Sequence, residues 1–172
     1  MKRSPYLAPL SREHLNALIL ASCLKNGVSS NPKYPWPTSP EEQRDKILQM
    51  WEQEMHSHFQ AEELYLFNPF HSSLSPDLQA LTQELLQDHK EMGEMILKLS
   101  QVSGPLLTEC LQKLGQQLEG HVRKEERVYY EGLQKEIPES ELAKAYTQIS
   151  ELYAQRGDVF SIFTGKKQSS PL

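Results

Sequence analysis

The chain has 172 residues, a length that fits one domain. Charged residues make up 24% of it, and the net charge is −5 at pH 7. A generally acidic surface argues against nucleic acid and against an anionic membrane as a main partner. Cys23 and Cys110 are too few for a disulfide framework or a cysteine-based zinc site, so we expect two buried free thiols. The opening MKRSPYLAPL lacks the apolar stretch of a secretory signal, and we predict a cytoplasmic location.

Proline and glycine divide the chain into five predicted helices. The first begins at Ser11 and stops near Gly27, and the proline-rich stretch 29–40 then forms a surface connection. The second begins with a capping box at Ser39 and ends before Asn68-Pro69. The first four predicted helices cover about residues 11–26, 40–67, 76–101 and 105–135, and a short fifth helix follows the break at 137–140 and ends near Gly157.

Apolar residues recur every three or four positions along these helices, and no stretch shows the sustained alternation of a strand. The connections between the long helices are mostly short. We therefore predict an all-α fold, an up-down-up-down four-helix bundle with a short additional C-terminal helix. Residues 1–160 are predicted to form this one domain, and residues 161–172 to be a disordered tail.

One six-residue pattern occurs twice, as HFQAEE from residue 58 and as HVRKEE from residue 121. Residues four apart lie on one face of a helix, so His58 and Glu62 form one chelating pair. His121 and Glu125 form another for the same reason. Both pairs continue the apolar stripe of their helix, which points them toward the core. A buried glutamate without a partner is costly, and a cation between the helices removes that cost.

The two other long helices each bring one more inward histidine, on the same stripe as their leucines. The candidate metal ligands are therefore His14, His58, Glu62, His89, His121 and Glu125. Each carboxylate can bridge two ions, so the set fits two metals better than one and leaves positions open for a small ligand. Imidazole with carboxylate suits iron, manganese or zinc, and the ligand types alone do not separate these metals.

Four segments of the sequence carry a family resemblance. SREHLNALIL, HFQAEELYLF, DHKEM and HVRKEERVYY, in that order, resemble the bacterial hemerythrin-like domain over about residues 11–135. The resemblance implies two iron ions in a binuclear, carboxylate-bridged centre inside a four-helix bundle. By position, the first two histidines of the set would serve one iron and the last two the other, with the two glutamates bridging them. It also implies a small ligand, namely oxygen, nitric oxide or peroxide, or a role in holding iron.

The sequence departs from the oxygen-carrying hemerythrins at Gly93. Those proteins have a second histidine four residues after the histidine of the third helix, and Gly93 stands at that place here. One iron would therefore lose a ligand. The departure argues against simple reversible oxygen carriage and favours the branch of the family with four histidines and two glutamates.

Several polar residues near the candidate ligands are not expected to bind metal. Glu63 and Glu126 lie about 100° round the helix from the candidate glutamates, so we expect solvated or supporting roles. His56 and His71 are expected at the surface. Tyr65, Tyr129 and Tyr130 could line the site or simply pack. Tyr129, four residues after the second candidate glutamate, is the best candidate for a residue beside the metals, and packing is the default expectation.

Three functions remain open from the sequence. The first is a module that binds or senses a small ligand, or holds iron. The second is a di-iron redox enzyme, an oxidase, a peroxidase or a nitric oxide reductase, although no separate acid, base or substrate pocket is evident. The third is a structural bundle that holds zinc or no metal, and the buried carboxylates make the metal-free form the least favoured. The sequence identifies no redox or signalling partner protein.

Overall fold

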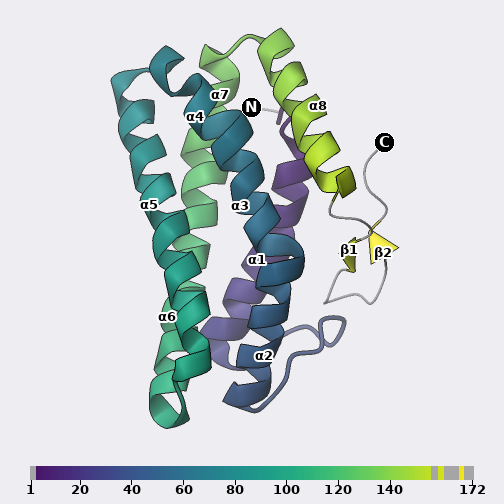
Figure 1. Ribbon diagram of the computed structural model, residues 1–172, viewed down its shortest axis with the longest axis vertical. Coiled ribbons are helices and arrows are strands. Elements are labelled where there is room, and N and C mark those ends of the chain that lie inside the picture. The colour runs from purple at the N-terminus through teal and green to yellow at the C-terminus, as the bar shows by residue number, and fades with distance from the viewer. Residues whose placement is uncertain (1–2, 156–158, 161–166, 169–172) are drawn as a thin grey trace.

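The computed structural model describes residues 3–155, 159–160 and 167–168, which are mostly helical (Figure 1). The α-helices are α1 (Ala8–Asn26), α2 (Pro40–Met50), α3 (His56–Glu62), α4 (Asn68–Phe70), α5 (Pro76–Lys98), α6 (Gly104–Lys124), α7 (Tyr130–Glu136) and α8 (Glu139–Gln155). They are continued by π-helical segments at Trp51–Met55, Glu63–Phe67 and Glu125–Tyr129, and by 3-10 turns at His71–Ser73 and Leu99–Gln101. The strands β1 (Val159–Phe160) and β2 (Lys167–Gln168) pair antiparallel, with Val159 opposite Gln168.

The helices before α8 join into four rods. These rods lie side by side and form a bundle (Figure 1). The first rod is α1, and the third is α5. The second consists of α2, α3 and α4, joined by two of the π-helical segments, and the fourth consists of α6 and α7, joined by the third such segment. Helix α8 packs against α3 and the π-helical segment that follows it. The predicted all-α class and the helical bundle are thus confirmed.

Two of the predicted helix ends are confirmed by their capping geometry. The Ser39 hydroxyl accepts a hydrogen bond from the backbone N–H of Glu42 at 3.2 Å, which satisfies one of the free donors at the start of α2. Gly27 ends α1 in the left-handed conformation, with φ 69°. Glycine reaches this conformation without a steric penalty, so the chain leaves α1 there and enters the proline-rich connection.

Two other predicted ends are wrong, and proline explains both. Helix α1 begins at Ala8 rather than at Ser11, because Pro9 suits the first turn of a helix, where no backbone donor is needed. Pro69 does not stop the second rod at Phe67. It lies in the first turn of α4, which is again a position that tolerates proline, and the rod continues through the 3-10 turn that follows.

The buried apolar side chains form two blocks. One block includes Leu20, Leu24, Ile47, Met92, Leu111 and Leu118. The other includes Leu10, Leu66, Phe67, Leu85, Tyr130 and Leu133. Along α1, for example, His14 lies between a residue of one block and a residue of the other. The buried imidazole of His14 therefore lies where the two apolar blocks meet.

Helices α1 and α6 pack closely along much of their length. Gly115 in α6 permits this approach, since a Cβ there would lie 2.8 Å from the carbonyl oxygen of Ala21 and 2.8 Å from the Cβ of Leu24. Contacts that short are not tolerated, so a larger residue would push α1 outward. Because His14 lies on α1, this contact also helps to position the His14 imidazole in the core.

The substitution Gly115→Ala is expected to lower the free energy of unfolding by about 1–3 kcal/mol, because the added methyl group overpacks the contact with α1. Gly120→Ala lies in the same helix and would meet no atom within 4 Å. It should raise that free energy by about 0.5–1 kcal/mol through helix propensity. Urea denaturation of the two variants measures both effects, and equal stabilities would contradict the close approach.

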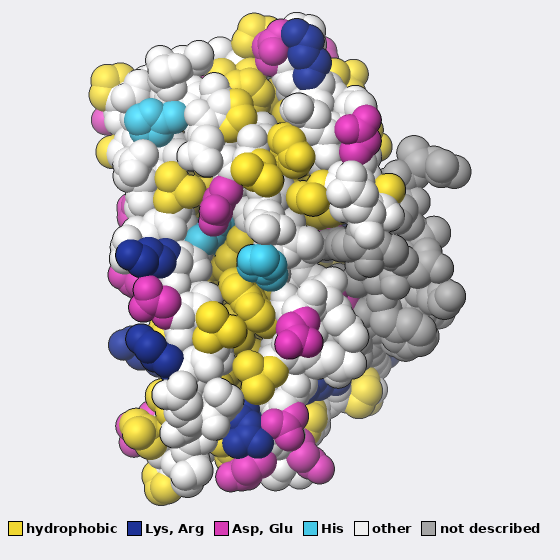
Figure 2. Space-filling model, in the orientation of Figure 1, with side chains coloured by type: hydrophobic (Ala, Val, Ile, Leu, Met, Phe, Trp, Pro, Cys, Tyr) yellow, Lys and Arg dark blue, Asp and Glu magenta, His cyan; other side chains and the backbone are white. Residues whose placement is uncertain are grey.

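The remaining predictions about the chain concern its cysteines, its surface and its end. Cys23 is buried as expected, whereas Cys110 is only half-buried, and both are free. Figure 2 shows hydrophobic side chains gathered down the middle of one face, with charged side chains on both sides of them. In the described part of the chain, no helix is long and apolar enough to cross a bilayer. The predicted disordered tail at 161–172 lies outside the described residues except for β2, so it stays a prediction.

Candidate metal centre

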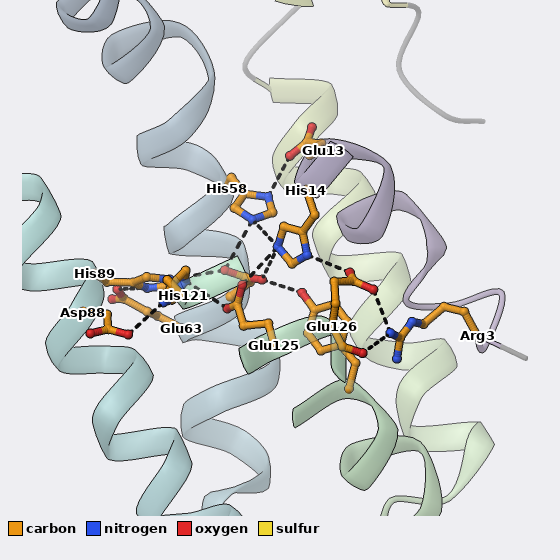
Figure 3. Close-up of polar contacts among 12 residues, drawn as sticks. Arg3, Glu13, His14, His58, Glu63, Asp88, His89, His121, Glu125 and Glu126 are labelled. Atoms are coloured by element: carbon orange, nitrogen blue, oxygen red, sulfur yellow. Dashed lines mark hydrogen bonds and ion pairs between the residues drawn. The ribbon is translucent and has the colours of Figure 1, made fainter. Parts of the chain in front are cut away.

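The structure brings all six predicted ligands together where the two apolar blocks meet (Figure 3). The four rods contribute His14 from α1, His58 and Glu62 from α3, His89 from α5, His121 from α6 and Glu125 from the π-helical segment after α6. Both glutamates have 0% of their surface exposed, and His58 is the most exposed of the six at 8%. The predicted grouping therefore forms one buried cluster.

The inward-facing Nε2 atoms of the histidines pair in two halves. His14 Nε2 lies 3.0 Å from His58 Nε2, and we refer to this pair as the first half of the cluster. His89 Nε2 lies 3.0 Å from His121 Nε2, and this pair is the second half. Each half therefore presents two nitrogen atoms to one point between them.

The two glutamates face both halves. The Nε2–carboxylate distances are 3.4 Å for His14–Glu62, His58–Glu62 and His89–Glu62, and 3.2 Å for His14–Glu125 and His121–Glu125. Glu62 turns Oε1 toward His14 and Oε2 toward His58 and His89. The arrangement is that of two donor sets that share their carboxylates.

The outward-facing Nδ1 atom of each histidine meets a carboxylate of its own (Figure 3). The pairs are His14–Glu126 at 2.7 Å, His58–Glu13 at 2.9 Å, His89–Glu63 at 2.9 Å and His121–Asp88 at 3.3 Å. An ionised carboxylate only accepts hydrogen bonds, so each Nδ1 carries the proton and donates it. This pairing fixes the tautomer and the orientation of all four rings.

A neutral histidine that is protonated on Nδ1 has an unprotonated Nε2. In each half, two nitrogen lone pairs would then face each other at 3.0 Å, beside ionised carboxylates. With Nε2 unprotonated, Glu62 Oε2 and both carboxylate oxygens of Glu125 have no hydrogen-bond donor in the described part of the chain. Two donors bound side by side to one ion at about 2.1 Å lie about 3.0 Å apart, which matches the nitrogen spacing in both halves. The residues therefore fit bound metal cations.

Protons compensate the charges when no metal is bound. Burial alone raises the pKa of Glu62, but the charge of His58 and hydrogen bonds with His14 and His89 lower that pKa well below its usual range. Burial alone lowers the pKa of His121, but the Glu125 carboxylate and the hydrogen bond with Asp88 raise it to about 9. The Glu62 carboxylate therefore stays ionised, and His121 takes up a second proton, on Nε2, in the place that a metal ion would occupy.

Two of the π-helical segments lie directly at the glutamates. One begins at the residue after Glu62, and another begins at Glu125. A π-helical turn has more residues than an α-helical turn, so it moves the following side chains round the axis by about one position. As a result Tyr130, five residues after Glu125, donates its hydroxyl hydrogen to Glu62 Oε1. Tyr129, the best candidate for this place, packs edge-on against Phe67 in the apolar block, which was the default expectation for it.

Four acids support the histidines, and two of them were predicted from the sequence. Glu63 and Glu126 lie in the supporting positions that were expected of them. Glu13 and Asp88 were missed, although each directly precedes a candidate ligand histidine in the sequence. The two acid–histidine pairs, EH and DH, were therefore the available signal.

The residues predicted to lie outside the centre do so. His56 is exposed, and His71 is half-buried and accepts a hydrogen bond from the Gln83 side chain at 3.1 Å, away from the cluster. A Cβ at Gly93 would lie 3.1 Å from the Trp51 ring. The indole therefore occupies the volume that a histidine at position 93 would need, and this position supplies no ligand.

A small cavity of about 40 Å³ reaches the cluster between α1, the second rod and α6. Its walls are mainly apolar, and the polar residues that line it include one histidine from each half, His58 and His121. A water molecule needs roughly 10–15 Å³ of such volume, so the cavity holds a molecule of few atoms. It therefore opens toward both halves of the cluster.

Comparison with known proteins agrees with this geometry. The sequence model of the hemerythrin HHE cation-binding domain matches residues 10–133. No curated protein and no solved structure gives a significant match.

The substitution Glu125→Ala is expected to lower the metal content sharply, because it removes a carboxylate that faces both halves of the cluster. His71→Ala should leave the metal content unchanged, because His71 lies away from the cluster. Metal analysis of the two purified variants, beside the unaltered protein, measures the difference. An unchanged metal content in Glu125→Ala would sink the bridging role of this glutamate.

Proposed function

The chain belongs to the hemerythrin HHE cation-binding domain family, and we propose that it is a non-haem di-iron protein that binds or senses oxygen, nitric oxide or peroxide, or holds iron. The observation that carries the proposal is the convergence of four Nε2 atoms and two carboxylates in two overlapping donor sets. The up-down-up-down order of the rods belongs to the same proposal.

In this proposal the first half of the cluster, His14 with His58, holds one ion, and the second half, His89 with His121, holds the other. Glu62 and Glu125 bridge the two, because each faces both halves. When bound, the two iron ions supply electrons and open coordination positions for a small ligand. Manganese or zinc would fit the same donor atoms.

The protein's own side chains prepare the centre for this role. The outer carboxylates keep each imidazole protonated on Nδ1, so Nε2 stays available. Tyr130 holds Glu62 through its hydroxyl group, and its ring stacks on His14 at a centroid distance of 5.5 Å. Phe59 stacks on His89 at 3.9 Å and excludes water from that side. The donors are thus oriented before any ion arrives.

The cavity supports a ligand of few atoms. Its apolar walls favour a small neutral molecule over an ion, and its volume is too small for an extended organic substrate. A diatomic gas or peroxide meets both conditions. The identity of the ligand, the partner protein and the cytoplasmic location stay predictions.

Metal analysis and ligand titration of iron-loaded protein test the proposal. We expect about two irons per chain and one stoichiometric spectral change with nitric oxide or oxygen. One zinc ion, or no metal after gentle purification, would instead favour a structural bundle. Repeated consumption of peroxide by the reduced protein would favour a di-iron redox enzyme, with the same residues holding the metals.

Narrowing the cavity tests the route of the ligand. Ala17 lines the cavity, so Ala17→Leu is expected to slow nitric oxide association with the iron-loaded protein about tenfold, a barrier increase of about 1.4 kcal/mol. Ala80→Leu makes the same change at an exposed position of α5 and should leave the rate unaltered. Stopped-flow absorption measures both variants at equal iron content. Identical rates would exclude this cavity as the route.

A further inference from the structure

Two side chains from outside the family-matched residues 10–133 reach the carboxylates that support the first half of the cluster. Arg3 precedes the matched segment and contacts Glu126, the partner of His14. Tyr153 follows it and contacts Glu13, the partner of His58. Both histidines of one half are therefore reached from the two flanking segments of the chain.

Arg3 holds Glu126 by two hydrogen bonds (Figure 3). Its Nη2 donates to the Glu126 carboxylate at 2.7 Å and to the backbone carbonyl of the same residue at 2.6 Å. The carboxylate accepts from Arg3 on one oxygen and faces His14 Nδ1 on the other. The guanidinium carbon also lies 5.2 Å from the centre of the Tyr130 ring, which stacks on His14. Arg3 thus restrains Glu126 and Tyr130, which both contact the His14 imidazole.

Tyr153 acts on the other imidazole of the same half. Its hydroxyl donates to Glu13 Oε2 at 2.8 Å, and the same oxygen lies 2.9 Å from His58 Nδ1. The hydroxyl oxygen is also 3.4 Å from that Nδ1. Tyr153 is 3% exposed and belongs to α8, which packs against α3, the helix that carries His58. The docking of α8 therefore fixes the Glu13–His58 pair.

The second half is supported from within the matched segment. Asp88, the partner of His121, accepts a hydrogen bond from Lys124 at 2.6 Å. Glu63, the partner of His89, has 36% of its side chain exposed to solvent. Its hydrogen bond with the imidazole therefore competes with water. The two halves share the same ligand chemistry but differ in what holds their outer carboxylates.

We propose that Arg3 and Tyr153 are positioning residues that make the two metal positions unequal in what supports them. The histidines of the first half depend on the flanking segments of the chain for their orientation. The inference rests on the proposed function, because it requires an ion in each half. Supporting partners of metal-bound histidines commonly change metal affinity by about 10–100-fold when they are removed. Here that effect falls on one ion and leaves the other in place.

The test uses the full chain loaded with Co²⁺, whose paramagnetism shifts the Nδ1 proton signals of bound histidines out of the crowded NMR region. Four exchangeable shifted signals are expected from the unaltered protein. Tyr153→Phe removes one oxygen atom and keeps the packed ring, so it should alter the exchange of one signal, that of His58. Arg3→Met should alter a different one, that of His14. Tyr146→Phe, the same change in the same helix, should alter neither.

Release of Co²⁺ to a chelator supplies the second readout. In Tyr153→Phe, one of the two ions should leave about tenfold faster than in the unaltered protein, and the other at the unaltered rate. Four unchanged signals with two unchanged release rates would overturn the inference while the di-metal proposal stands. Equal acceleration of both ions would also overturn it. Uptake of fewer than two Co²⁺ ions by the unaltered protein would overturn the proposed function and this inference together.

Discussion

Two carboxylates are buried beside four imidazole nitrogens at one level of the bundle. The rest of the structure depends on the neutralisation of these two negative charges. Taking a single ionised group out of water costs several kcal/mol even after relaxation. A whole domain is stable by only about 5–15 kcal/mol. An uncompensated cluster would therefore offset most of the net stability of the domain. Cations, either metal ions or protons on the imidazoles, are a condition for this fold.

The supporting structure around that layer has a regular plan. Two of the supporting acids directly precede a ligand histidine in the sequence, and the two others directly follow a ligand glutamate. Each of the four binds the histidine of another rod. The same hydrogen bonds therefore orient the donors and tie the rods to one another. The close contact of α1 with α6 at Gly115 serves this plan, since it brings α1 near enough for His14 to reach the rings and carboxylates of its neighbours.

The sequence was sufficient for the helical class, for most of the rods and for the six residues of the cluster, because helical periodicity places His58 and His121 on apolar stripes. It was not sufficient where periodicity changes. The π-helical turn at Glu125 brings Tyr130 rather than Tyr129 to the cluster, and no residue in that segment predicts a π-helical turn. Contacts such as that of Tyr153 depend on how α8 docks, which is a matter of tertiary packing.

The indole at position 51 has an optical consequence. The chain contains two tryptophans, Trp36 and Trp51. Trp36 lies in the proline-rich connection, with the Lys46 ammonium 5.6 Å from its ring. Trp51 contacts Phe59 edge-on at 5.8 Å, and Phe59 stacks directly on His89. Open-shell metal ions quench nearby indole emission strongly. The emission of Trp51 is thus expected to fall when such an ion binds in the cluster, which reports binding without any added dye.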